Sequence, residues 1–82
     1  PTFGARPEAI QAIQNGQKRF WLSDLSNAPL SGLNMSGNSF YLVNLKGAIL
    51  SGANLDKATF TNCDLSHANL SKASLVGSSL GI

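Results

Sequence analysis

The sequence predicts an all-β solenoid in which the chain turns a corner once every five residues. From Leu25 to Leu80, every fifth residue is large and apolar. Small residues, mostly Ala, stand two positions before most of these large residues. Gly, Asn or His stands two positions after most of them. A repeat this regular decides the architecture before any single residue is considered.

The large apolar positions have a spacing that neither a helix nor a flat sheet can bury, because five matches neither the helical period nor strand alternation. They hold Leu25, Leu30, Met35, Phe40, Leu45, Leu50, Leu55, Phe60, Leu65, Leu70, Leu75 and Leu80. A small and a large residue two positions apart point to the same side of an extended segment. The chain must therefore turn in each repeat.

The corners are expected two residues after each large residue. Gly, Asn and His tolerate the positive φ that a type II turn requires. Three of the expected corner positions hold other residue types, namely Leu42, Lys57 and Lys72. Four corners close a square, so one coil takes twenty residues.

The order of residues within the units carries a family resemblance. The clearest units are Gly52-Ala53-Asn54-Leu55-Asp56, Ala68-Asn69-Leu70-Ser71 and Cys63-Asp64-Leu65-Ser66. They resemble the A-(D/N)-L-x-x units of the pentapeptide repeat family, and twelve consecutive units over 23–82 match its spacing. The resemblance implies a right-handed quadrilateral β-helix of about three coils.

Residues 1–22 precede the repeats and are predicted to contain a short capping α-helix. Pro7 suits the first helical turn, Glu8 complements the positive end of the helix dipole, and Gly16 is a good C-terminal stop. Two turns of helix would not hold alone in water. We therefore expect the helix to cover the N-terminal end of the column, as similar helices do in the family.

Residues twenty positions apart should stack in neighbouring coils. One such column is Phe20, Phe40, Phe60 and Leu80, which we interpret as core and not as a ligand site. The inward Asn38 should hydrogen-bond to a neighbouring backbone group, because an unpaired buried amide costs about 1–3 kcal/mol. Pro29 lacks an amide donor, which is tolerable if that position faces the capped end.

Composition predicts one small soluble domain without a cofactor. The chain has 82 residues and a net charge of +2. No apolar run approaches the roughly 18 residues that span a membrane, so we expect a cytoplasmic protein with no membrane partner. The single Cys63 falls on an inward position and is expected to be buried. One His and one Cys cannot supply a zinc site, and no metal is expected.

The sequence also argues against catalysis. His67 lies near Ser66 and Asp64, but Ser is frequent in the repeats and alternate residues point to opposite sides. Gly47 and Gly52 imitate half of a phosphate-binding loop, yet no Lys-Ser or Lys-Thr follows. We expect a non-enzymatic structural or protein-protein interaction module.

One group of outward positions departs from the polar pattern. Trp21, Leu22, Tyr41 and Leu42 are expected to form an apolar patch on the first coils, and Trp and Tyr are enriched at interaction hot spots. Two interpretations stay open. The patch is a surface for a protein partner, or the N-terminal segment that includes Phe3 folds over it.

The net charge of the chain tests an alternative function, imitation of duplex DNA. Some members of the family imitate duplex DNA and bind type II topoisomerases, which needs a strongly acidic rod. Here six Lys and Arg stand against four Asp and Glu, which disfavours that alternative. Direct binding of nucleic acid gains little support, because Lys46, Lys57 and Lys72 fall on different faces.

The last repeats suggest an uncovered end. Solenoids need capped ends for solubility, and the repeats up to Ile82 offer no polar cover for the last coil. Its expected stacking residues are Leu65, Leu70, Leu75 and Leu80. We expect this end either to stack on a second copy in an end-to-end homodimer or to continue into further repeats.

Overall fold

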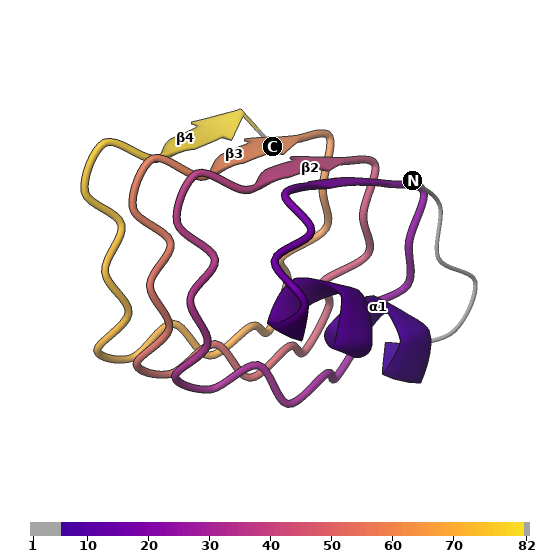
Figure 1. The fold of residues 1–82 in the computed structure, drawn as a ribbon. Helices are drawn as coiled ribbons and strands as arrows, with labels where there is room; N and C mark the ends of the chain where they lie inside the picture. Colours follow the sequence, from indigo (N-terminus) through magenta and orange to yellow (C-terminus); the bar gives the residue numbers. More distant parts are fainter. Residues whose placement is uncertain (1–5, 82) are drawn as a thin grey trace.

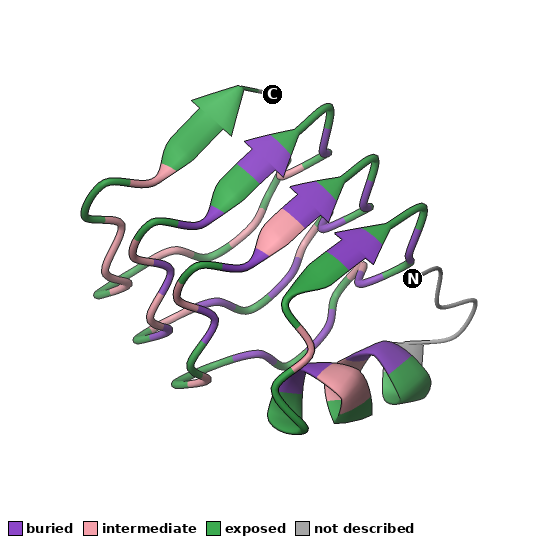
Figure 2. Cartoon of the chain, turned by 45° about the horizontal axis from the view of Figure 1, so that its top comes forward, coloured by how far each residue is buried: buried purple, intermediate pink, exposed green. Residues whose placement is uncertain are grey.

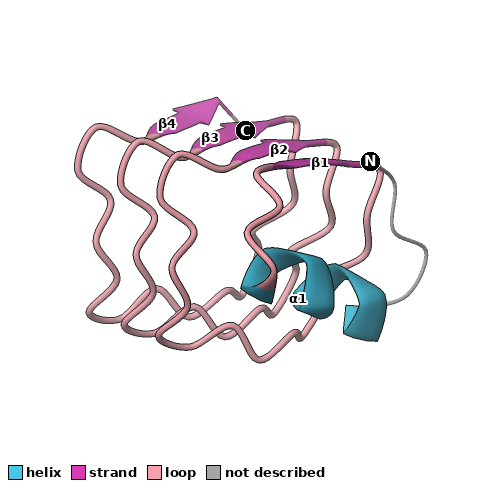
Figure 3. Cartoon of the chain, viewed as in Figure 1, coloured by secondary structure: helices cyan, strands magenta, loops and turns pink. Residues whose placement is uncertain are grey.

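The computed structural model describes residues 6–81, which form a short helix followed by a coiled column of parallel β-structure (Figure 1). Helix α1 spans Arg6–Gln14, and each coil then contributes one three-residue strand. These are β1 (Arg19–Trp21), β2 (Ser39–Tyr41), β3 (Thr59–Thr61) and β4 (Ser79–Gly81). The four strands lie side by side in the order β1-β2-β3-β4, and the other sides of the column are loops and turns (Figure 3).

The register of the strands confirms the expected twenty-residue coil. Phe20 pairs with Phe40, Phe40 with Phe60, and Phe60 with Leu80, all in parallel. Isolated bridges repeat the same shift on the other three sides, at Asp24↔Asn44, Pro29↔Ile49, Asn34↔Asn54, Asn44↔Asp64, Ile49↔Asn69 and Asn54↔Ser74. The column is therefore four-sided, and each residue stands above the one twenty positions earlier.

The corners lie where the sequence placed them, and they do not depend on glycine. Leu42, Lys57 and Lys72, the exceptions in composition, also have positive φ, of 54°, 61° and 60°. Three of the four corners in a coil close with a backbone hydrogen bond across the turn, as from Ala48 N to Leu45 O at 3.0 Å. The conformation is imposed by stacking between coils, which outweighs the local preference of the side chain.

Asn and Asp side chains brace these corners, a role that the sequence analysis did not anticipate. At six units the side-chain Oδ1 before the core residue accepts the backbone N–H two residues later. Asn54 Oδ1, for example, accepts the Asp56 N–H at 3.0 Å. Such Asx turns hold the chain at the start of a turn. This gives a physical reason for Asn or Asp at the second position of the unit.

The core consists of the buried residues that recur along the inner coils, and Figure 2 shows where buried residues lie on the chain. The large residues from Phe20 to Phe60 are at most 2% exposed. The Phe20 and Phe40 rings stack with centroids 5.5 Å apart, and Phe40 and Phe60 with centroids 5.1 Å apart. Such pairs add roughly 0.5–1.5 kcal/mol each beyond area burial. The interpretation of this column as core is confirmed.

Cys63 is buried, as expected, at an inward position. Its Sγ lies 3.4 Å from Phe40 O and 3.5 Å from Thr61 O, and the single S–H is shared between these two acceptors. Burial raises the pKa of this thiol, so it stays protonated at neutral pH.

Helix α1 covers the N-terminal end of the column. Ala9 and Ile13 are buried in the same cluster as the coil residues, at 0% and 4% exposure. The helix ends at Gln14, and Gly16 follows it with a φ of 88°. Gly16 N donates to Ile13 O and Gln17 N to Ala12 O, which is the Schellman arrangement. The expected cap and its glycine stop are both present.

The sequence analysis singled out the hydrogen bonding of two unusual residues, Asn38 and Pro29. Asn38 is 1% exposed, and its Oδ1 has no hydrogen-bond partner, so the expectation that its amide would bond the backbone is wrong for this atom. No described donor lies within hydrogen-bonding reach of this oxygen. Pro29 behaves as expected: one coil later, Ile49 N donates back to Ala28 O, so the missing Pro29 donor faces the N-terminal end.

Candidate interaction surfaces

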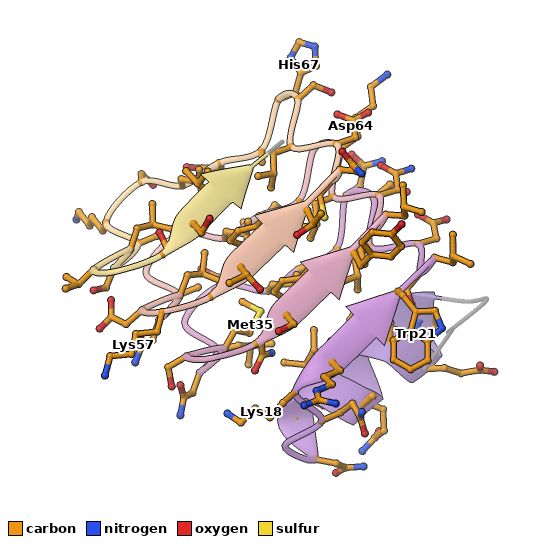
Figure 4. All side chains as sticks on the ribbon, turned by 90° about the horizontal axis from the view of Figure 1, so that it is seen from above. Lys18, Trp21, Met35, Lys57, Asp64 and His67 are labelled. Atoms are coloured by element: carbon orange, nitrogen blue, oxygen red, sulfur yellow. The ribbon has the colours of Figure 1, made fainter. Side chains whose placement is uncertain are left out.

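An apolar ridge runs along the corner that follows β1 and β2. We define it as Trp21, Leu22, Tyr41 and Leu42, which are 41%, 59%, 50% and 41% exposed. Trp21 pairs with Tyr41 in the parallel register, so the two aromatic side chains occupy neighbouring coils at the same corner. Figure 4 shows Trp21 at the outer edge of β1.

The backbone of this corner is held by hydrogen bonds to the next coil. Leu22 and Leu42 are the corner residues, with φ of 55° and 54°. Leu22 N donates to Tyr41 O at 3.0 Å and Leu42 N to Thr61 O at 2.9 Å. Both residues are therefore pinned between coils in a left-handed conformation. For a Leu, the left-handed backbone conformation costs roughly 1–2 kcal/mol. The inter-coil hydrogen bonds must therefore offset this cost.

The ridge ends abruptly along the column. The next coil has Thr61 and Asn62 at the same two positions, so the apolar surface is confined to the first two coils. It is flanked by polar residues, with Arg19 and Ser39 on the strand side and Asp24 and Asn44 beyond the corner. A compact apolar area with a polar rim is the usual anatomy of a protein interface.

The sequence-predicted patch is thus brought together, and all four of its residues are exposed. The competing interpretation involved Phe3, which lies outside the described residues. Two other exposed apolar residues were missed: Ile49, at 43% exposure, and Val76, at 72%. The fixed five-residue register could have found both, because each is an apolar residue at an outward position. They stand on other sides of the column and do not extend the ridge.

The C-terminal end of the column is the second candidate surface. Leu65, Leu70 and Leu75 are partly buried and Leu80 is 46% exposed, whereas their counterparts one coil earlier are buried. Figure 2 shows this change of burial from the inner coils to β4.

Ser66 and Asp64 are bonded to each other within one turn, and His67 is the corner residue of that turn. Ser66 Oγ donates to Asp64 Oδ1 at 2.6 Å, and the same oxygen accepts Ser66 N at 2.9 Å. These bonds are the first cause of the lowered pKa of the Asp64 carboxyl. His67 is an exposed corner residue with φ of 61°. The Ser66 hydroxyl is thus bonded within the turn, and Figure 4 shows the Asp64 and His67 side chains projecting outward from the coil.

Comparison with known proteins agrees with the repeat geometry. Eight copies of the pentapeptide repeat match residues 39–77. The structure resembles the crystal structure of a pentapeptide repeat protein, Rfr23, from the cyanobacterium Cyanothece 51142, with a TM-score of 0.62 and 29% sequence identity. Residues 39–77 carry the repeats of the pentapeptide repeat family. Its fold is the right-handed quadrilateral β-helix that the sequence predicted.

The match to Rfr23 covers 77% of this pentapeptide repeat chain and 47% of the Rfr23 chain. The chain therefore spans about half the length of that relative. No curated protein matches the sequence. Within residues 6–81, no helix is long and apolar enough to cross a membrane.

Acidic side chains of this pentapeptide repeat protein do not line one continuous face. Asp24 and Asp64 share a row, but Asn44 stands between them. Asp56 lies on another side, and Glu8 belongs to helix α1. A DNA-like surface requires closely spaced negative charges along a rod. The arrangement, like the net charge of +2, disfavours the DNA-mimic alternative.

Proposed function

We propose that this pentapeptide repeat protein is a non-enzymatic interaction module that presents the apolar ridge to a protein partner. The observation that carries the proposal is the ridge itself. Two aromatic and two Leu side chains are exposed together at one corner. Trp and Tyr are over-represented among residues that dominate binding energy, and they supply large contact area at little conformational cost.

The coiled column supports this role because it holds the ridge rigidly. The backbone on both sides of the ridge is bonded to the next coil, as at Leu22 N–Tyr41 O and Leu42 N–Thr61 O. A preordered backbone loses little entropy on binding, so more of the contact energy appears as affinity. The partner surface that fits is an apolar groove with a polar margin, which would accept Trp21 and Tyr41 as anchors.

The first test measures capture by immobilised protein. Partner proteins retained by the wild type should be lost from the Trp21→Ser/Tyr41→Ser double variant. Ile49→Ser is the matched control, since Ile49 is also an exposed apolar residue but stands on another side of the column. A partner that binds the double variant as well as the wild type would sink the proposal.

Thermal unfolding of the double variant separates binding from folding. Because Trp21 and Tyr41 are about half exposed, their replacement should change the free energy of unfolding by less than about 1 kcal/mol. A large fall in Tm would instead show that the ridge is covered within the protein. Trp21 is the single tryptophan, so its emission should shift to shorter wavelength when a purified partner buries it.

A further inference from the structure

The turn that joins helix α1 to β1 contains the pair Asn15-Gly16, and no other Asn in the sequence is followed by Gly. Asn is one of the chemically labile residues of proteins. Its side-chain amide is attacked by the backbone nitrogen of the next residue. Gly permits this attack best, because it has no Cβ to obstruct the ring that forms.

The Asn15 side chain is free to react. It is exposed, and none of the described residues is hydrogen-bonded to its amide. A Cβ placed at Gly16 would meet no atom within 4 Å, so the space beside the Gly16 backbone is open. The ring that the reaction closes therefore meets no steric obstacle in the folded protein.

Most other Asn side chains are held in place by the fold. The Oδ1 atoms that accept a backbone N–H two residues later belong to Asn34, Asn44, Asn54 and Asn69. Each of these four is followed by Leu or Met, whose side chain obstructs attack by the backbone nitrogen. Asn38 is buried at 1% exposure. Structure and sequence thus single out Asn15.

We propose that Asn15 is a site of spontaneous deamidation and that the reaction loosens the helical cap of the column. The Gly16 nitrogen loses its proton to hydroxide and bonds to the side-chain carbonyl carbon of Asn15, and the side-chain nitrogen leaves as ammonia. Water then opens the resulting succinimide at either of its two carbonyl carbons. The products are aspartate and isoaspartate at position 15, and water is the only co-reactant consumed.

One hydrogen bond opposes the reaction. Gly16 N donates to Ile13 O at 3.0 Å, and this bond must open before the nitrogen can attack. It lies beyond Gln14, the last residue of helix α1. Opening is easiest there, because the ends of helices fray. The bond therefore slows the reaction without preventing it.

Either product weakens the attachment of helix α1. A carboxylate at position 15 lies at the negative end of the helix dipole, and the last turn of α1 has no basic residue. Isoaspartate also lengthens the backbone by one carbon, which disrupts the bonds from Gly16 N to Ile13 O and from Gln17 N to Ala12 O. Because helix α1 buries Ile13 in the core cluster, the modification opens the N-terminal end of the core to water.

Incubation of the purified protein in warm, mildly alkaline buffer tests the proposal, with peptide mapping by mass spectrometry. The peptide with Asn15 should gain the small mass that distinguishes an acid from an amide. Asn62 is the internal control, because it is also exposed but is followed by Cys63, and it should stay unmodified over the same time. Asn15→Gln should gain no mass, because Gln would have to close a larger ring.

The same experiment on the urea-unfolded chain measures the protection that the fold gives. The folded protein should react no more than about tenfold more slowly than the unfolded chain. Amide hydrogen exchange then reports on the cap. The Gly16 and Gln17 amides should exchange at least about tenfold faster in the modified protein than in the fresh protein. The Leu45 and Leu50 amides, which are bonded to the next coil, should not change.

Three results would overturn the proposal. The first is a folded protein in which Asn15 reacts more than about tenfold more slowly than in the unfolded chain, or not at all. The second is modification of Asn62 as fast as that of Asn15. The third is unchanged exchange of the Gly16 and Gln17 amides after Asn15 has reacted. None of these measurements involves the apolar ridge, so failure here is distinguishable from failure of the proposed function.

Discussion

Asp64 shows how a single side chain fixes a corner. Its Oδ1 accepts both the backbone N–H and the hydroxyl of Ser66, and these bonds lower the pKa of the carboxyl from its ordinary value of 3.8. The nearby Lys46 and His67 also lower the pKa of this carboxyl, to a smaller extent. The ionised form is therefore the one that the folded protein prefers.

A pH dependence follows from this preference. A carboxyl whose pKa is lower in the folded state stabilises the fold above its unfolded-state pKa, and this contribution is lost as pH falls through the folded-state pKa. Asp64→Asn keeps the acceptor oxygen but cannot titrate. Denaturant unfolding should show that the wild type loses more stability than Asp64→Asn below the ordinary pKa of 3.8. Identical acid profiles would contradict this role, since all other carboxyls are common to both proteins.

Asn38 is a residue whose burial opposes stability. Its Oδ1 is buried without a partner, and one coil later the same position holds Ala58. Asn38→Ala removes a penalty of about 1–3 kcal/mol and leaves a small void worth less than about 1 kcal/mol. We expect a net gain of about 1 kcal/mol in the free energy of unfolding, measured by denaturant titration. A loss of similar size would show that the amide is needed in the fold.

At the scale of elements, the corner is the unit that repeats. The corner position with positive φ is occupied by Gly in some repeats and by Leu, Lys, Asn or His in others. A Cβ at Gly52 would meet no atom within 4 Å, whereas a Cβ at Gly47 would collide with the Asn27 side chain one coil below. The two glycines therefore serve different purposes: one relieves backbone strain, and the other also makes room for a neighbour.

Alanine substitutions should separate these purposes. Gly52→Ala should cost about 1 kcal/mol, from the left-handed conformation alone. Gly47→Ala should cost about 1 kcal/mol more, because Asn27 must leave its preferred rotamer. In an Asn27→Gly background the two substitutions should become equal, which a double-mutant cycle of unfolding free energies measures. If they are equal already in the wild type, the contact with Asn27 carries no cost.

At the scale of the whole molecule, stability should decline towards the C-terminal end. Leu55 is 0% exposed and has coils on both sides, whereas Leu80, in the last coil, is 46% exposed. In a solenoid each coil is stabilised by its neighbours, and within residues 6–81 the last coil is stacked on one side only.

A pair of truncations measures this gradient. Leu55→Ala should lower the free energy of unfolding by about 2–5 kcal/mol, and Leu80→Ala by less than about 1 kcal/mol. Equal losses would mean that the last coil is packed as tightly as the middle one.

The sequence by itself determined the coil and its core. The five-residue period predicts that each large residue points inward, and it predicts a corner two residues later. Side chains that recur at this interval can be buried together only if the backbone turns once in every repeat. The Phe column, the buried Cys63 and the stop at Gly16 followed from the same pattern. The ridge residues were also found, as apolar exceptions at outward positions.

Only the tertiary structure decided the features that depend on contacts between coils. Leu42 and Lys57 adopt positive φ although their side chains disfavour it, and the backbone N–H of each donates to a carbonyl of the next coil. Asn38 Oδ1 stays unpaired because no donor reaches it. Gly47 differs from Gly52 only through a residue twenty positions away. A sequence pattern records which positions are inside, but the satisfaction of each polar group depends on neighbours that only the stacked coils bring together.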